Sequence, residues 1–197
     1  EEWRITPYRD IFEAESRSFY AASMSHMDEA IGTLIKTLEE EGLAKDTLVT
    51  FFSDNGGESP GKKGYLRPVP TFRTTTSLER YGDNRPLRGW KYQLYEGGIR
   101  VPAVMWWPGV LEPRKVDNPV IVYDIMPTLV HLSGAAATDN MKIEGRNIWP
   151  AVIGEPLPGD RIFYWGMHNQ IAVRVGDWKL IHNGGTPDEG SEELFNI

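Results

Sequence analysis

The amino-acid sequence predicts an α/β fold with a small antiparallel sheet at its C-terminal end, and three patterns support this prediction. From Phe19 to Leu38, apolar side chains recur every three or four positions, which is the period of an amphipathic helix with one buried stripe. Thr47 to Ser53 is a β-rich run with little polar alternation, typical of an interior strand covered on both faces. After Pro156, short apolar runs alternate with glycine-containing turns, as in an antiparallel meander.

The first helix and strand have the order of an α/β unit. Gly42 supplies a stop for the helix, and the strand then ends in Asp54-Asn55-Gly56-Gly57. In open α/β sheets, ligands bind in the crevice at the carboxyl ends of the strands. The tetrapeptide therefore lies where a ligand site is expected.

Further elements are predicted along the rest of the chain. Ile99 to Trp107 predicts another buried strand, and Tyr123 to Leu132 predicts a short helix that Asp124 caps and Gly134 ends. The C-terminal meander is predicted at Ile162–Trp165, Ile171–Val175 and Trp178–His182. We place the C-terminal part of a main α/β domain at residues 1–155 and a small antiparallel-sheet subdomain, truncated at its end, at residues 156–197.

Composition excludes several classes of function. The 197 residues contain no cysteine, which removes disulfides, thiolate nucleophiles and thiolate metal sites. A net charge of -7 argues against nucleic acid as the general partner. Apolar runs such as Val101 to Trp107 are far shorter than the roughly 20 residues that span a bilayer, so no membrane association is expected. Both ends look cut, and the chain is expected to be one part of a larger protein.

Charge is unevenly distributed along the chain. Residues 58–88 have a local charge of +4 and suit a small anionic substrate. The segment carries seven basic and three acidic side chains: Lys62, Lys63, Arg67, Arg73, Arg80, Arg85 and Arg88 against Glu58, Glu79 and Asp83.

Three residues are candidates for binding and catalysis. Asp54 and Asn55 offer a carboxylate and an amide oxygen side by side, both hard donors that calcium and magnesium prefer. Asp-Asn-Gly-Gly is also typical of a plain turn, and by itself the tetrapeptide favours that interpretation. Lys91 precedes the paired glycines Gly97 and Gly98, which permit close backbone approach or a positive φ, and could reach an anion. A single lysine is more often a solvated surface group.

The order of these motifs resembles the second half of the type I, formylglycine-dependent sulfatases, which include the arylsulfatases. The resemblance covers nearly the whole chain. It is carried by Ser25–Gly32, Phe52–Gly57, Leu87–Lys91, Tyr95–Pro102, Tyr123–Leu129, Glu144–Arg146 and Val173–Leu180.

The resemblance implies a fold, a reaction and a set of site residues. Asp54 and Asn55 stand where the family places two calcium ligands, and Lys91 where it places a catalytic lysine that contacts the sulfate. The implied fold is the alkaline-phosphatase-like α/β sandwich with a small C-terminal antiparallel sheet. The implied reaction is metal-assisted hydrolysis of a sulfate ester through a covalent sulfo-enzyme intermediate on a formylglycine. A periplasmic or secreted location is expected on the same ground.

The sequence departs from the family at the nucleophile. It contains no cysteine and no Ser-x-Pro/Ala-x-Arg motif from which formylglycine is made. The nucleophile and the remaining calcium ligands are therefore expected outside this chain, which alone should be inactive. Its expected partners are a missing N-terminal half, or a second copy of itself, and a sulfated glycan or small molecule. Two alternatives remain: a phosphodiesterase or phosphonate hydrolase of the same superfamily, and a non-catalytic anion- or glycan-binding module.

Among the four histidines, His168 is the candidate for substrate contact, because it lies in a loop where some members of the family line the substrate pocket. His26, His131 and His182 are predicted to be structural. Trp90, which flanks Lys91, is the tryptophan to test for carbohydrate contact.

Overall fold

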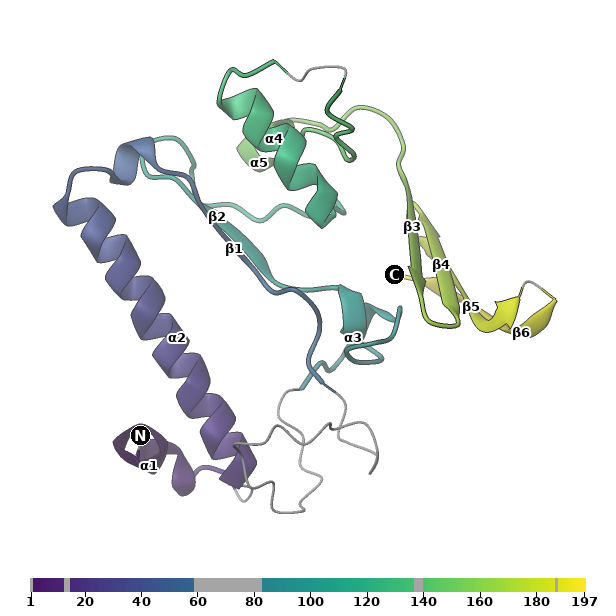
Figure 1. Ribbon diagram of the computed structural model, residues 1–197, viewed down its shortest axis with the longest axis horizontal. Helices are drawn as coiled ribbons and strands as arrows, with labels where there is room; N and C mark the ends of the chain where they lie inside the picture. Colours follow the sequence, from purple (N-terminus) through teal and green to yellow (C-terminus); the bar gives the residue numbers. More distant parts are fainter. Residues whose placement is uncertain (1, 13–14, 59–82, 137–139, 187) are drawn as a thin grey trace.

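The computed structural model describes residues 2–12, 15–58, 83–136, 140–186 and 188–197, which form helices and two antiparallel sheets (Figure 1). Lys62, Lys63, Arg67, Arg73, Arg80 and Glu79 of the predicted basic segment lie outside the described residues. The elements in chain order are α1 (Glu2–Arg9), α2 (Glu15–Glu40), η1 (Ala44–Asp46), β1 (Val49–Phe52), α3 (Glu96–Ile99), β2 (Ala103–Trp106), η2 (Val122–Asp124), α4 (Ile125–Leu132), α5 (Trp149–Ile153), β3 (Ile162–Met167), β4 (Gln170–Val175), β5 (Trp178–Thr186) and β6 (Glu189–Asn196).

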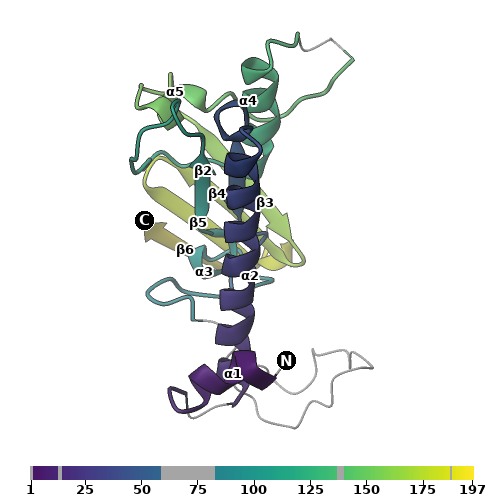
Figure 2. The same cartoon turned by 90° about the vertical axis from the view of Figure 1, so that its left-hand side faces the viewer.

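Helix α2 confirms the predicted amphipathic helix, and Gly42 follows it with a φ of 70°, a backbone conformation that ends helices. The predicted burial of its apolar stripe is wrong for this chain, because Met24, Met27 and Leu34 are exposed. Helix α1 lies across the N-terminal end of α2 and reaches as far as Glu29, which pairs with Arg4 (Figures 1 and 2). No described helix is both long enough and apolar enough to cross a lipid bilayer.

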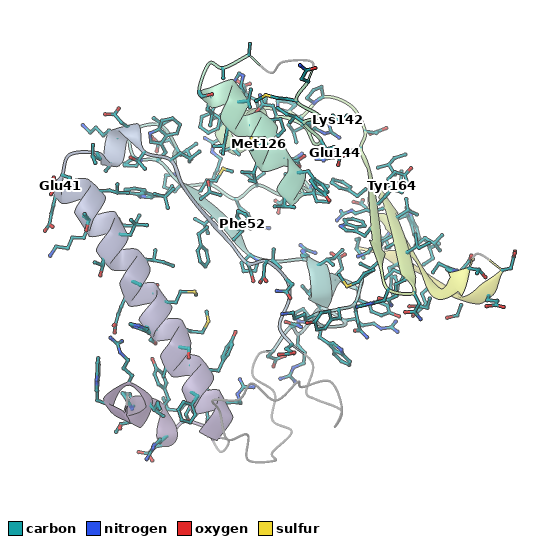
Figure 3. All side chains as sticks on the ribbon, viewed as in Figure 1. Glu41, Phe52, Met126, Lys142, Glu144 and Tyr164 are labelled. Atoms are coloured by element: carbon teal, nitrogen blue, oxygen red, sulfur yellow. The ribbon has the colours of Figure 1, made fainter. Side chains whose placement is uncertain are left out.

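Strands β1 and β2 pair antiparallel, with Val49 opposite Trp106 and Phe52 opposite Ala103. Both are shorter than predicted, and they are not covered on both faces. Phe52 and Val104 are exposed because no further strand or helix of the described residues packs over them (Figure 3). Ile99 belongs to α3 and not to the strand.

The C-terminal half confirms the predicted meander, and β6 adds a fourth strand in the order β3-β4-β5-β6. Gly176, with a φ of 57°, forms the turn between β4 and β5. Helix α5 ends at Ile153 and β3 begins at Ile162, so the predicted domain division at residues 155/156 falls in the connection between them. That division stays a prediction.

The C-terminal sheet packs against the segment around α3. Leu94 and Tyr95 form a buried cluster with Ala172 of β4 and Ile181 of β5. A buried ion pair adds to this contact, because the Lys179 ammonium lies 2.7 Å from a Glu96 carboxylate oxygen and its side chain is only 1% exposed. Burial lowers the pKa of the Lys179 ammonium, and the Glu96 carboxylate opposes that shift.

Asp124 organises the region between α4 and the C-terminal sheet. It was predicted to cap α4, but its side chain makes no capping bond to that helix. Its fully buried carboxylate instead pairs with both terminal nitrogens of Arg161, at 2.5 and 2.6 Å, and accepts the backbone N–H groups of Ile121 and Arg146. Burial alone would raise the pKa of the Asp124 carboxyl, but these hydrogen bonds outweigh it and lower the pKa.

Replacing Asp124 with Asn should lower the free energy of unfolding by about 3 kcal/mol, because it leaves the largely buried Arg161 guanidinium without its counter-charge. The lowered pKa means that this stabilisation is present above about pH 4, the range of a free aspartate, and is lost as the pH falls further. Urea unfolding between pH 3 and 7 measures both effects. Asp117→Asn, which breaks an exposed pair with Lys115, is the matched control and should change little. Equal effects of the two variants would contradict the role of Asp124.

Candidate functional site

The Asp54–Gly57 turn follows β1 directly and is held in place by its backbone. The Ser53 hydroxyl donates to the Asn55 carbonyl at 2.9 Å, and the Gly56 N–H donates to the Gly98 carbonyl at 2.9 Å. The Asp54 side chain is exposed, and within the described ranges it makes no hydrogen bond or ion pair. The turn is therefore fixed by main-chain contacts, which leave the carboxylate available to a ligand.

Lys91 is brought to the same place by a backbone hydrogen bond. Its N–H donates to the Gly57 carbonyl at 3.0 Å, so the predicted lysine and the predicted Asp54-Asn55 pair lie on adjoining loops. Asn84 joins these loops a second time. Its carboxamide oxygen accepts the Gly57 N–H at 2.9 Å, and its nitrogen donates to the carbonyls of Gly57 and Gly89, both at 3.1 Å.

Sequence reasoning missed Asn84. It lies in an irregular segment without periodicity, and a single asparagine there gives no signal that distinguishes a bridge from an ordinary turn residue.

Glycines make this close packing of loops possible. A β-carbon at Gly56 would lie 1.8 Å from the Gly97 carbonyl oxygen, and one at Gly97 would lie 2.3 Å from the Gly89 carbonyl oxygen. A β-carbon at Gly98 would lie 2.1 Å from the Gln93 carbonyl oxygen. The close backbone approach predicted for the paired glycines is therefore confirmed.

The C-terminal sheet supports the Lys91 loop from the other side. The Gln170 side-chain oxygen, at the start of β4, accepts the Leu94 N–H at 2.9 Å. Arg88 pairs with Glu193 of β6 at 2.5 Å, and the Tyr95 hydroxyl donates to the same carboxylate. Hydrogen bonds from Tyr95 and Arg88 lower the pKa of the Glu193 carboxyl.

His168 lies beside this loop, at the turn between β3 and β4. Its ring faces that of Tyr92, with 6.2 Å between the centroids, and the Lys91 ammonium is 5.4 Å from the centroid of the Tyr92 ring. All four predicted site residues therefore belong to two neighbouring loops and the hairpin that supports them. Tyr92 carries no motif that would have singled it out from the sequence.

The donor chemistry at the end of β1 fits a hard divalent cation. Asp54 and Asn55 supply oxygen donors of the kind that calcium and magnesium bind. A complete site needs more, since calcium takes six to eight oxygen ligands. Across the described residues, no group of three or more His, Cys, Asp or Glu side chains is placed to hold a metal ion. This chain can thus provide part of a metal site.

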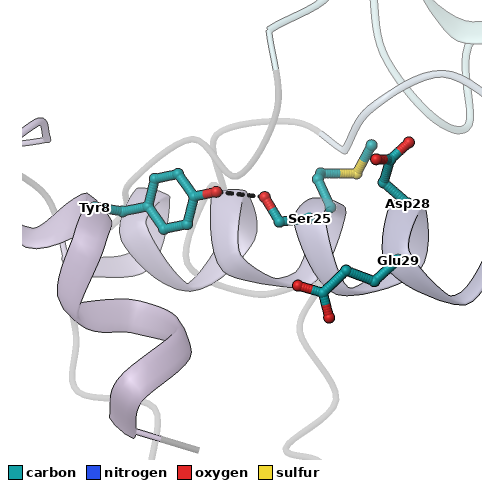
Figure 4. A pocket seen from close by; sticks show the side chains of 5 residues that line it. Tyr8, Ser25, Asp28 and Glu29 are labelled. Atoms are coloured by element: carbon teal, nitrogen blue, oxygen red, sulfur yellow. Dashed lines mark hydrogen bonds between the residues drawn. The ribbon is translucent and has the colours of Figure 1, made fainter. Parts of the chain in front are cut away.

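The remaining histidines and the Trp90 side chain, which the sequence also singled out, take no part in the described hydrogen bonds between these loops. His26 and His131 are exposed on α2 and α4, and a ring nitrogen of His182 lies 2.8 Å from the Thr186 carbonyl oxygen. Trp90 is partly exposed next to Lys91. An open hollow of about 580 Å³ between α1 and α2 is lined by Tyr8, Met24, Ser25, Asp28 and Glu29, and includes none of the site residues (Figure 4).

Comparison with known proteins decides the family. A family model described as Sulfatase matches residues 3–135. The chain belongs to the sulfatase family. The steryl-sulfatase of Rattus norvegicus is 32% identical over 179 residues, which cover 83% of this chain and 28% of that protein. Arylsulfatase A of Homo sapiens is 31% identical over 173 residues, covering 85% of this chain and 31% of that protein. The chain thus spans less than a third of the length of these two sulfatases.

Solved structures confirm the alkaline-phosphatase-like α/β fold with its C-terminal antiparallel sheet. The crystal structure of Ps i-CgsB in complex with k-i-k-neocarrahexaose superposes with a TM-score of 0.77 at 26% identity, covering 100% of this chain and 40% of that one. The PsFucS1 sulfatase from Pseudoalteromonas sp. gives a TM-score of 0.62 at 24% identity, covering 90% of this chain and 34% of that one. The order of elements in this sulfatase chain therefore recurs in larger sulfatases.

Replacing Gly56 with Ala should separate the Asp54–Gly57 turn from the Lys91 loop of this sulfatase chain, because the new methyl group would overlap the Gly97 carbonyl. We expect the free energy of unfolding of the variant to be lower by about 2 kcal/mol. The Lys91 amide should also lose protection from hydrogen exchange.

Gly32→Ala is the matched control, because Gly32 lies in α2 with no atom within 4 Å of the added carbon. That change should stabilise the protein by up to about 1 kcal/mol. Unchanged protection of the Lys91 amide in the Gly56 variant would contradict the role of the close loop packing.

Proposed function

We propose that this chain is part of a sulfatase that hydrolyses sulfate esters of carbohydrates or aryl compounds, with its nucleophile outside these 197 residues. The observation that carries the proposal is the hydrogen bond from the Lys91 N–H to the Gly57 carbonyl, at 3.0 Å. It supports the proposal because it holds the loop that carries Lys91 against the turn that carries Asp54 and Asn55, in a chain of the sulfatase family. A cationic side chain and a metal-binding pair of oxygen donors are groups that can stabilise the negative charge of a sulfate ester during hydrolysis.

Asp54 and Asn55 would hold a calcium ion together with ligands from outside this chain. A divalent cation stabilises negative charge on sulfuryl and leaving-group oxygens. Lys91 would donate hydrogen bonds to the sulfate oxygens and stabilise the charge that they carry in the transition state. Its ammonium is not tied up by any ion pair among the described residues. A formylglycine would supply the nucleophile by family resemblance.

The carbohydrate class has additional support from similar proteins. Ps i-CgsB, at 26% identity, was crystallised with a neocarrahexaose, and N-acetylgalactosamine-6-sulfatase of Canis lupus familiaris is 28% identical over 172 residues. We propose a sulfated glycan as the substrate class on this basis, and His168 as a residue that contacts it. A periplasmic or secreted location would suit such a substrate, and fractionation of the native host tests it.

Replacing Lys91 with Ala in the full-length protein should lower kcat for a sulfate ester at least about 100-fold. The variant would lose a group that stabilises negative charge in the transition state. Asp54→Asn should also lower turnover, but added calcium should restore part of it, since that change weakens metal affinity. Lys115→Ala, an exposed lysine outside the site, is the control and should leave kcat unchanged.

Steady-state kinetics with sulfate and phosphate esters in parallel distinguishes the competing functions. Faster turnover of phosphate esters would favour the phosphodiesterase alternative. Full turnover by the Lys91 variant would exclude the catalytic role of Lys91. Absence of turnover in the full-length protein would favour a glycan-binding module.

We further propose that the exposed apolar side chains of α2 and of the β1–β2 sheet pack against the missing N-terminal half of the protein, or against a second copy. Met24, Leu34, Phe52 and Val104 are each 40% to 60% exposed, and large exposed apolar side chains of this kind favour association. Light scattering on the isolated chain should give a mass well above its 22.3 kDa. A monodisperse monomer would argue against this proposal.

A further inference from the structure

Two aromatic residues beside Lys91 have left-handed backbone conformations. Tyr92 has a φ of 72° and His168 a φ of 53°, and they are the only non-glycine residues with positive φ in the described part of the chain. This conformation is uncommon for side chains other than glycine. Histidine adopts it more readily than most residues, whereas for the bulky Tyr92 side chain it is strained. Burial does not compensate for the strain at Tyr92, which is 59% exposed, and His168 is also exposed. Such outliers occur preferentially at ligand sites.

The two residues come from distant parts of the sequence and meet at the site. Tyr92 follows Lys91 in the loop before α3, whereas His168 lies in the turn of the β3–β4 hairpin. Their ring centroids are 6.2 Å apart with the planes inclined by 55°. The contact is secured by neighbouring residues, since the Gln170 side chain accepts the Leu94 N–H at 2.9 Å. The loop and the hairpin are therefore held in one arrangement.

We propose that Tyr92 and His168 form the wall of a subsite for the sugar ring of a sulfated carbohydrate whose sulfate contacts Lys91. This inference rests on the proposed sulfatase function. An exposed tyrosine ring offers an apolar face to the C–H groups of a sugar, and the imidazole nitrogens offer hydrogen bonds to its hydroxyl groups. An aryl group would use the tyrosine face alone and leave the imidazole without a role.

The position of Lys91 links this subsite to the chemistry. Its ammonium lies 5.4 Å from the centroid of the Tyr92 ring, so a sulfate bound to the lysine would have its sugar next to that ring. Tyr92 and His168 are therefore specificity-determining residues that position the substrate, while Lys91 contacts the group that is transferred.

The test uses the full-length protein and replacements that keep the backbone conformation. Tyr92→Gly and His168→Asn both tolerate positive φ, so each removes the aromatic ring without imposing new strain. We expect each to lower kcat/KM for a sulfated oligosaccharide by about tenfold or more, mainly through KM. For 4-nitrophenyl sulfate the loss in His168→Asn should be less than about twofold, because that substrate has no hydroxyl groups to bond.

Two controls separate this effect from damage to the site. The inhibition constant of inorganic sulfate, which probes the sulfate contact alone, should be unchanged in both variants. Tyr164→Ala removes another exposed tyrosine, on β3, and should leave kcat/KM for the oligosaccharide unchanged.

The outcomes distinguish this inference from the proposed function. If both variants retain the oligosaccharide kcat/KM while Lys91→Ala loses it, the subsite is wrong and the sulfatase function stands. Equal losses by His168→Asn on the oligosaccharide and on 4-nitrophenyl sulfate would also overturn the carbohydrate subsite. If Lys91→Ala retains full turnover of both substrates, the proposed function fails together with the inference.

Discussion

The close contact between the Asp54–Gly57 turn and the loop from Gly89 to Gly98 is the constraint on which the site depends. Main-chain hydrogen bonds from Gly56 to Gly98 and from Lys91 to Gly57 join the two segments. They form only because glycines let carbonyl oxygens approach to distances at which a β-carbon would overlap. The backbone therefore fixes the positions, and within the described part of the chain the side chains of Asp54 and Lys91 make no ion pair.

The C-terminal sheet extends this constraint to residues far along the chain. Lys179 of β5 pairs with Glu96 of α3, and Gln170 of β4 binds the Leu94 N–H, so the sheet holds the segment that carries Lys91. Both partners of the Lys179–Glu96 pair are largely shielded from water, and removing Glu96 would leave the buried Lys179 ammonium without its counter-charge. A buried ion pair of this kind fixes the position of the C-terminal sheet relative to α3 more than it adds to stability. That role suits a sheet that holds the loop carrying Lys91.

The sequence predicted elements with a clear local pattern and failed where structure depends on distant partners. The amphipathic period of α2 and the glycine-separated runs of the meander are local, and both were confirmed. The predicted burial of β1 was wrong. An apolar composition shows that a strand needs partners over its faces, but not whether the same chain supplies those partners. Asp124 was taken for a helix cap because its place before α4 is a local signal. Its true partner, Arg161, is 37 residues away.

The candidate site shows the same division. Asp54, Asn55 and Lys91 were found because their motifs occur in a recognisable order, whereas Asn84 and Tyr92 have no motif and act through contacts made across the fold. Nothing local distinguishes a tyrosine with a φ of 72° from an ordinary one. A strained backbone conformation persists only where surrounding contacts hold it in place. At Tyr92 these contacts are the Gly57–Lys91 and Leu94–Gln170 hydrogen bonds, which lie before and after it in the sequence. The same backbone contacts that hold Lys91 thus also hold the Tyr92 ring, so the proposed sulfate contact and the proposed sugar contact would both depend on one loop.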